Sequence, residues 1–416
     1  MNSPRIVAFY LPQFHPIPEN DRWWGKGFTE WTNTTAAQPL FPDHYQPHLP
    51  ADLGFYDLRL RATRHEQIRL AREYGIDAFC YHYYWFSGTR ILERPLLDML
   101  SDAESDMPFC LCWANENWTR RWDAAEHEVL IAQRYLANDA VDFIRSIEPF
   151  LTDPRYLRIA GRPILLVYRP QQLPDARATL AAWRDYWRSR GHGELHLCAA
   201  LTHGNVNYVQ FGFDSGVEFP PHNLQAGTGN VNPEVTFLKP FRGNVLQLPT
   251  VARDYLDRRH EGGNVFRCVC PSWDNTARLG DRALVLLNGT PANYEFWLAE
   301  AIRRTRSDFP GEERLVFVNA WNEWAEGCHL EPDRRYRHAF LEATRLAVRG
   351  ESVLQDFVDV GLPKPGDYQR RFGVDLCEVF VYHYWLQIGR VRLWFNRHPA
   401  LKNALRPLVR LLRSSR

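Results

Sequence analysis

The chain has 416 residues, of which 45% are apolar and 24% charged, values typical of a globular protein with one large domain or one domain with additions. The net charge is only +1, but residues 386–416 hold eight Lys or Arg and no acidic residue, so the first 385 residues carry 42 basic and 49 acidic side chains, a net charge of −7. The main body therefore gives no indication of nucleic-acid binding, and the lack of a run of eighteen apolar residues argues against a membrane-spanning helix.

Eight short apolar runs recur along the chain. They predict strands at 6–11, 75–83, 109–115, 164–169, 195–201, 214–219, 266–270 and 315–321. Most are continuously apolar rather than alternating, as expected of parallel strands that are covered on both faces. Apolar residues at three-to-four spacing predict helices between them, at 58–74, 139–151, 173–190, 250–260, 291–307 and 335–349.

Strands that alternate with helices predict an α/β protein with a single (β/α)8 barrel of the TIM type over residues 1–350. Long βα loops are expected at 12–57 and 220–249, and a C-terminal helical extension at 351–416. The alternative is an open doubly wound sheet. It is disfavoured because no glycine-rich nucleotide fingerprint follows any predicted strand.

Polar and aromatic side chains crowd the ends of the predicted strands, where such barrels carry their chemistry. We predict substrate contacts there from Tyr10, Gln13, His15, His82, Tyr84, Trp85, Trp113, Asn115, Glu116, Trp118, Tyr168, Glu218, Trp273, Asp274, Asn275 and Arg278, and from Trp24, Glu30 and Trp31 in the long first loop. Aromatic faces offer flat apolar platforms to sugar rings. The pattern therefore predicts a catalytic face that binds an oligo- or polysaccharide.

The segment FVNAWNEWAEGCHLEPD at 317–333 carries the strongest prediction. Glu323 and Glu326 are expected to be catalytic, because sugar-bond cleavage uses one carboxyl group that donates a proton and another that stays ionised. Trp321, Asn322, Trp324 and Glu331 are expected to contact the substrate. The structural alternative is a helix N-terminus, where acidic residues are favourable. Glu116, which also follows a strand, is the second candidate for the acid.

No metal ion or cofactor is expected. His15 and His82 lack a third ligand at metal spacing, so contact with sugar hydroxyls is the preferred role for both. The pairs Cys110/Cys112 and Cys268/Cys270 do not have a usual zinc spacing, and we expect buried thiols. Because a short polar leader without a signal peptide precedes the first strand, we expect a cytoplasmic protein.

The basic tail 386–416 has two interpretations. Ile388, Val391, Trp394 and Phe395 fall on one helical side, with Arg and Lys on the other. Such a helix can bind peripherally to the anionic inner face of the cytoplasmic membrane. Alternatively it packs on the acidic barrel body. The oligomeric state is left open.

Six strings carry a family resemblance: FYLPQFH, WWGKGFTEWTN, YHYYWF, WANENWTRRWD, PSWDNTAR and NAWNEWAEGCHLEPD. Together, from about Arg5 to Val348, they resemble the WbsX family of polysaccharide-biosynthesis proteins, which is similar to the endo-acting α-mannosidases and mannanases of glycoside hydrolase family 99. The resemblance implies a (β/α)8 barrel and places that family's carboxylate pair on Glu323 and Glu326.

In family 99 the first carboxylate acts as base toward the sugar's own 2-hydroxyl and gives a 1,2-anhydro intermediate, while the second is the acid and then the base. The resemblance therefore implies retention of configuration on α-mannosides or α-rhamnosides. A carboxylate nucleophile about 5–5.5 Å from the acid is the common alternative, and it stays open.

Three functions remain in competition. The first is a retaining endo-glycosidase or transglycosidase of bacterial surface polysaccharide, such as lipopolysaccharide O-antigen or exopolysaccharide. The second is a glycosyltransferase with an activated donor, either soluble or lipid-linked. The third is a non-catalytic glycan-binding scaffold, against which the intact Glu323/Glu326 pair argues.

Overall fold

The computed structural model describes residues 3–120, 125–205, 207–260 and 263–358. Most of the predicted C-terminal extension, including the basic tail 386–416, lies outside the described residues. Residues 351–358, which are described, form no helix.

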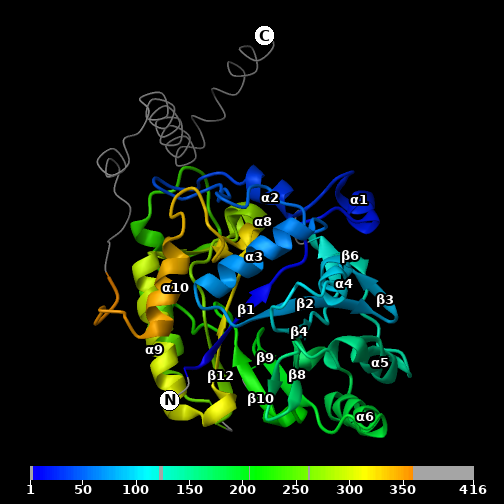
Figure 1. Ribbon diagram of the computed structural model, residues 1–416. Coiled ribbons are helices and arrows are strands. Elements are labelled where there is room, and N and C mark those ends of the chain that lie inside the picture. Colours follow the sequence, from blue (N-terminus) through cyan, green and yellow to red (C-terminus); the bar gives the residue numbers. More distant parts are fainter. Residues whose placement is uncertain (1–2, 121–124, 206, 261–262, 359–416) are drawn as a thin grey trace.

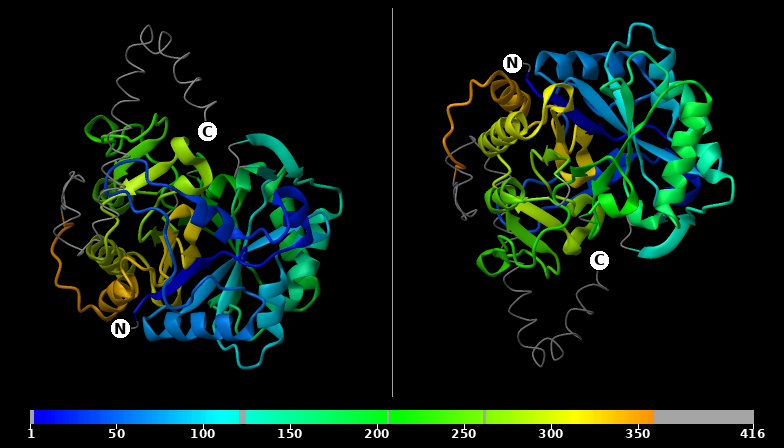
Figure 2. Two further views of the ribbon diagram at one scale, coloured as in Figure 1. Left: turned by 90° about the horizontal axis from the view of Figure 1, so that it is seen from above. Right: turned by 90° about the horizontal axis from the view of Figure 1, so that it is seen from below.

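Eight parallel strands form a closed barrel, which confirms the predicted fold class. They are β1 (Arg5–Tyr10), β2 (Ala78–Phe86), β4 (Phe109–Trp113), β8 (Arg162–Val167), β9 (His196–Leu201), β10 (Ser215–Glu218), β12 (Val265–Val269) and β14 (Leu315–Val318). Each strand pairs with the next around the barrel, and closure comes from β1, which pairs with both β2 and β14. Figure 2 shows the strands from above and below, with helices on the outside.

The strands are buried on both faces because their apolar residues run without a break. All five residues of β4, Phe-Cys-Leu-Cys-Trp, are buried, as are all six of β9. The cysteines in the described ranges, Cys110, Cys112, Cys268 and Cys270 among them, are buried free thiols. They act there as small apolar side chains, as predicted.

Helices follow the strands and cover the barrel (Figure 1). They are α3 (Arg61–Glu73), α4 (Arg94–Ser101), α5 (Asp139–Leu151), α6 (Ala176–Ser189), α7 (Leu248–Asp257), α9 (Pro291–Asp308) and α10 (Ala339–Arg349). Side-chain caps start α6 and α9, where Asp175 and Thr290 accept hydrogen bonds from the backbone N–H three residues on. The two-turn α4 was not predicted, because eight residues offer too short a periodic pattern.

The connection from β9 to β10 departs from the strict alternation of strands and helices. Its described residues contain only the 3-10 turn η3 (Val209–Phe211). Short helical turns elsewhere in the described chain include η2 (Pro170–Gln172), η4 (Asn232–Glu234), η5 (Gly280–Arg282) and η6 (Gly311–Glu313).

Both predicted long loops carry structure of their own. The first, from 12 to 57, contains α1 (Pro18–Trp24) and α2 (Glu30–Ala36), which lie near one end of the barrel at the top of Figure 1. The second contains β11 (Asn244–Gln247), which pairs in parallel with β13 (Leu284–Leu287). Leu40 and Phe41 of the first loop pack with Val245 and Val285 in a separate apolar cluster, so the two loops support each other.

Short antiparallel pairs complete the fold. They join β3 (Thr89–Ile91) to β2, β5 (Trp118–Arg120) to β6 (Ala125–Ile131), and β7 (Arg158–Ile159) to β8. Within the described ranges, no helix combines the length and the apolar character that a bilayer crossing requires.

Candidate active site

A cavity of about 420 Å³ lies where the carboxyl ends of the barrel strands meet. Each strand, or the residues directly after it, contributes to the lining, as is usual for a (β/α)8 barrel. The predicted site residues that line it are Gln13, His82, Tyr84, Glu116, Trp118, Tyr168, Trp273, Asn275, Arg278, Glu323 and Glu326. Both predicted catalytic carboxyl groups therefore share one cavity with aromatic side chains from several strands.

The guanidinium of Arg278 joins the Glu323 and Glu326 carboxylates. After β14 the chain forms a hairpin of β15 (Asn322–Glu323) and β16 (Cys328–His329), with the single turn η7 (Trp324–Glu326) between them. Arg278 lies on the short helix α8 (Thr276–Leu279); its Nη2 atom is 2.8 Å from Glu323 Oε2, and its Nη1 atom donates to Glu326 Oε1. One rigid fork thus holds both carboxylates.

Glu30 is a third carboxylate on the same guanidinium. It is the first residue of α2 and fully buried, and its Oε1 atom lies 2.6 Å from Arg278 Nη2. It does not line the cavity, so we revise its predicted role from substrate contact to a partner of Arg278. Three ionised carboxylates and one guanidinium would together carry a charge of −2, which a buried site disfavours.

The carboxylate cluster therefore tends to retain a proton. Burial raises the pKa of Glu323 to about 8; the Arg278 charge opposes this shift, and the carboxylates of Glu326 and Glu30 add to it. Burial also raises the pKa of Glu30 to about 7, again against the charge of Arg278. Because the groups share one cation, they titrate as a unit, with Glu323 and Glu30 competing for the proton.

Backbone contacts fix the turn that presents Glu326. The Asp274 N–H donates to the Glu326 carbonyl at 2.6 Å, and the Ser272 hydroxyl donates to the Gly327 carbonyl at 2.5 Å. Gly327 has φ +56°, and a Cβ atom there would lie 2.9 Å from Asp274 Cβ, so only glycine fits. The Asp274 carboxylate itself binds His44 and Gln46, and it supports the turn rather than lining the cavity.

The pairs Asn115-Glu116 and Asn322-Glu323 share one arrangement, in which the asparagine binds backbone and the glutamate lines the cavity. Asn322 accepts from the Leu11 N–H at 2.7 Å and donates to the Leu11 carbonyl at 3.0 Å. Asn115 makes the matching pair of bonds to the backbone of Arg169, at 2.7 and 2.9 Å. Each asparagine clamps the end of a neighbouring strand, and the glutamate that follows it lines the cavity. The predicted sugar contacts of Asn115 and Asn322 are revised accordingly.

Histidines and aromatic rings from other strands also line the cavity. Tyr168 hydrogen-bonds His222 at 3.2 Å, and the rings of His203 and His222 lie 4.5 Å apart. Burial, with a smaller contribution from the charge of Arg278, lowers the pKa of His82 to about 4, so this ring is neutral at pH 7. Glu116, the second candidate acid, pairs with Arg169 at 3.0 Å.

Several predicted aromatic contacts belong to the packed interior instead. Tyr10, Trp31, Trp85, Trp113, Trp321 and Trp324 are all at most 8% exposed and do not line the cavity. Trp113 stacks on Phe143, and Trp324 stacks on His329. A buried indole supplies a large apolar area, and this packing role replaces the predicted sugar platform at these positions.

Three further predicted residues lie away from the cavity. Glu331 is buried and accepts hydrogen bonds from Trp324, Tyr56 and Gln67 at 2.6 to 2.8 Å; burial nevertheless raises its pKa to about 7. His15 is buried, and Trp24 stacks on Phe28. We therefore revise all three from substrate contact to structural roles.

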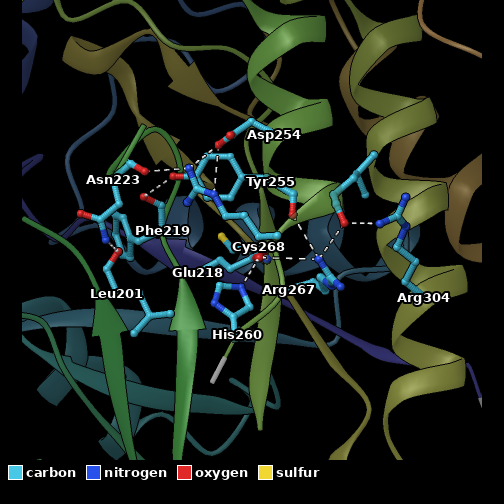
Figure 3. A network of polar contacts seen from close by, with 12 residues as sticks. Leu201, Glu218, Phe219, Asn223, Asp254, Tyr255, His260, Arg267, Cys268 and Arg304 are labelled. Atoms are coloured by element: carbon cyan, nitrogen blue, oxygen red, sulfur yellow. Dashed lines mark hydrogen bonds and ion pairs between the residues drawn. The ribbon is translucent and has the colours of Figure 1, made fainter. Parts of the chain in front are cut away.

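Glu218 belongs to a polar network between β10, β12 and α7, which Figure 3 shows from close by. Its carboxylate binds His260 at 2.9 Å and accepts from the Cys268 N–H at 3.2 Å. Arg267 links the network to the Tyr255 and Leu256 carbonyls of α7. Glu218 thus joins strands to a helix and does not line the cavity, contrary to its predicted substrate contact.

Sequence reasoning missed four polar residues that line the cavity: Asn117, His203, His222 and Asn319. Each follows its strand by one to four residues, so the strand-end rule applied to every loop would have found them. It also missed a group of potential metal ligands. Among the described residues, His48, His329 and Asp333 have ligand atoms within 4.8 Å of one another, whereas His15 and His82 belong to no such group.

Two solved structures with the same fold are named as sugar-cleaving or related proteins. One is a glycoside hydrolase-like protein, with a TM-score of 0.52 and 14% identity over 84% of this chain and 94% of the other. Another is the GH99 endo-alpha-mannosidase from Bacteroides thetaiotaomicron, with a TM-score of 0.52 and 14% identity over 83% and 97% of the two chains. At this identity the likeness establishes the (β/α)8 fold.

Sequence relatives are much more similar. The uncharacterized protein WxcX, from two strains of Xanthomonas campestris pv. campestris, is 47% identical over 348 residues. The match covers 82% of this chain but 49% of WxcX, so the chain spans about half the length of these relatives. The sequence profile named glycosyltransferase WbsX matches residues 6–344. The chain therefore belongs to the WbsX glycosyltransferase family.

Proposed function

We propose that this protein is a retaining endo-glycosidase or transglycosidase of bacterial surface polysaccharide, acting on α-mannoside or α-rhamnoside linkages. The observation that carries the proposal is the pair Glu323 and Glu326, held in one cavity on the two terminal nitrogens of Arg278. The fold that the chain shares with an endo-alpha-mannosidase supports the substrate class.

In the proposed reaction Glu326 donates a proton to the leaving oxygen, and Glu323 accepts the proton of the sugar 2-hydroxyl, which attacks the anomeric carbon. Glu326 then takes the proton of the water or acceptor hydroxyl that attacks the anomeric carbon, and Glu323 returns its proton to the 2-oxygen as the anhydro ring opens. Glu323 must be ionised to act as base, and Glu326 must hold the proton that the leaving oxygen receives. The raised pKa of Glu323 therefore places the active form at neutral to alkaline pH, with the proton of the cluster on Glu326. A direct attack by Glu323 on the anomeric carbon is the alternative route for the same pair.

The cavity offers groups for binding as well as for catalysis. Tyr84, Trp118 and Trp273 supply aromatic faces to sugar rings, and His82 and Gln13 supply hydrogen-bonding groups. Glu116 is either a hydroxyl ligand or the acid. Pairing with an arginine does not separate Glu116 from Glu326, since both carboxylates have such a partner.

A glycosyltransferase is the second candidate, and the family name favours it. In that case Glu323 would deprotonate an acceptor hydroxyl, and a sugar with an activated leaving group would be the donor. A non-catalytic glycan-binding scaffold is the third. A binding scaffold would not explain why two carboxylates are held on one guanidinium inside the cavity.

The deciding experiment screens the purified protein against α-manno- and α-rhamno-oligosaccharides, with sugar nucleotides and lipid-linked sugars tested in parallel. Glycosidase function predicts cleavage without a sugar nucleotide and no stimulation by added Mn²⁺ or Mg²⁺. Product formation only from an activated donor would favour the transferase. Binding without turnover in every assay would favour the scaffold.

A further inference from the structure

Three buried side chains from two distant segments converge beside the β15/β16 hairpin. His48 Nδ1 lies 2.9 Å from His329 Nε2, and His329 Nε2 lies 3.9 Å from Asp333 Oδ2. All three side chains are at most 6% exposed. The group is separate from the cavity, which none of the three lines.

Two of the three ligand side chains, His329 and Asp333, are oriented by a second contact. His329 Nδ1 is 3.0 Å from the Glu331 carbonyl, so this nitrogen carries the proton and the Nε2 lone pair faces His48. Asp333 Oδ1 accepts from the Tyr336 N–H at 2.5 Å, which leaves Oδ2 toward the histidines. An imidazole fixed through its other nitrogen to a carbonyl is the usual arrangement of a metal ligand.

We propose that His48, His329 and Asp333 bind a divalent transition metal ion, with Zn²⁺ as the best match to two imidazoles and one carboxylate. Zinc ligands in a tetrahedron lie about 3.3 Å apart, given bond lengths of about 2.0–2.1 Å. The observed separations of 2.9 and 3.9 Å lie on either side of this value, and all three ligand atoms lie within 4.8 Å of one another, so the side chains would have to close by at most about 1.5 Å around the ion. His48 coordinates through Nδ1 and moves its proton to Nε2, and a water molecule completes the shell.

The ion would be a structural clamp and not a catalyst. His48 lies in the second half of the long first loop. The residues that follow it pair with the segment of Asp333: the Arg334 N–H donates to the Leu49 carbonyl and the Ala51 N–H to the Pro332 carbonyl, both at 2.9 Å. His329 stands opposite Asn322 in the hairpin that presents Glu323. The metal would therefore fix the first loop, which carries Glu30, to the catalytic hairpin.

The test uses full-length, untagged protein and measures metal directly. We expect about one equivalent of zinc per chain by elemental analysis, and a Co²⁺-substituted form with the intense visible bands of four-coordinate nitrogen and oxygen ligation. His48→Gln and Asp333→Asn should each lose at least about tenfold in zinc affinity. His338→Gln is the matched control, because His338 pairs with Asp52 at 2.6 Å outside the group and should keep full affinity.

The proposal fails if the folded wild-type protein neither contains zinc nor binds Zn²⁺ or Co²⁺ in equilibrium dialysis, in which case the group is a hydrogen-bonded triad only. It also fails if His48→Gln and Asp333→Asn bind zinc as the wild type does. The Co²⁺ spectrum of the wild type decides the matter even if a variant does not fold. None of these measurements depends on the sugar chemistry proposed for the cavity.

Discussion

Replacing Glu30 with glutamine should move the acidic limb of the pH–rate profile to lower pH. Glu30 and Glu323 bind the same Nη2 atom of Arg278, at 2.6 and 2.8 Å, so these two carboxylate oxygens lie at most about 5.4 Å apart. The negative charge of Glu30 makes ionisation of Glu323 harder. Removing it lowers the pKa of Glu323, and the base form then persists at lower pH.

The size of the shift follows from Coulomb's law. Two unit charges about 5 Å apart repel by roughly 3 kcal/mol at an effective dielectric constant of 20, or about 2 pH units. Glu30 has its own pKa of about 7 and is largely ionised near pH 8, where Glu323 titrates, so we expect a shift of about 1 to 2 pH units. The absolute rate is also expected to fall, because Arg278 loses one of its three partners.

The assay measures kcat/KM from pH 5 to 9 on the best substrate of the oligosaccharide screen. Glu218→Gln is the matched control, because Glu218 is equally buried but binds His260 and Arg267 rather than Arg278, and its profile should match the wild type. An acidic limb that stays in place in Glu30→Gln, or moves to higher pH, would refute the assignment of Glu323 as a base coupled to Glu30.

Four other predictions follow from the same site and from the tail. Glu326→Gln should abolish turnover of unactivated substrates, and its loss of activity should be smallest on substrates with activated leaving groups. The comparison variant Glu116→Gln should retain measurable activity on the unactivated substrates. The reverse ranking of the two variants would make Glu116 the acid. Glu323→Gln should lose as much activity as Glu326→Gln, and should do so even on substrates with activated leaving groups. A 2-deoxy substrate should react far more slowly than its parent sugar, and equal rates for these two substrates would favour a carboxylate nucleophile. Because the raised pKa of Glu323 makes its ionisation costly in the folded state, the wild type loses stability as pH rises from about 5 toward 8. The free energy of unfolding of Glu323→Gln relative to wild type, measured with urea, should therefore increase by about 4 kcal/mol between pH 5 and pH 8.5. A difference that does not change with pH would contradict the raised pKa. More of the full-length protein than of a 1–385 truncation should co-sediment with anionic liposomes at low salt, because each basic residue of the tail contributes about 1 kcal/mol at an anionic surface. If both forms stay in the supernatant, the tail has another role.

The barrel was predictable because most of its strands are continuous apolar runs. Residues such as those of β4 and β9 are buried on both faces, and the sequence pattern records this directly. The position of the site was predictable for a related reason, since chemistry in this fold lies at the carboxyl ends of strands. Glu323, Glu326 and Arg278 were predicted in this way, and all three line the cavity.

Side-chain direction at the strand ends was not predictable. Asn115 and Glu116 are neighbours, as are Asn322 and Glu323, yet in each pair one side chain clamps a backbone and the other lines the cavity. The same applies to Glu218, which joins β10 and β12 to α7. Adjacent residues on an extended chain point to opposite sides, and an error of one position exchanges the two roles.

Contacts between residues that are distant in the sequence could not be predicted either. Glu30 and Arg278 are separated by 248 residues, and His48 and His329 by 281. Their pairing depends on how the first loop folds over the barrel end, which local patterns do not encode. Tryptophans raised a different difficulty, because an indole such as that of Trp113 serves a packed interior as well as a sugar subsite.

The most direct test of the central claim is time-resolved proton NMR of the first product formed from α-manno- and α-rhamno-oligosaccharides by the wild-type protein and by Glu326→Gln. The account predicts that the wild type releases the α anomer first, which then mutarotates, and that the variant releases no product from these unactivated substrates. Initial release of the β anomer, or equal product formation by both proteins, would contradict the assignment of Glu323 and Glu326 as a retaining catalytic pair.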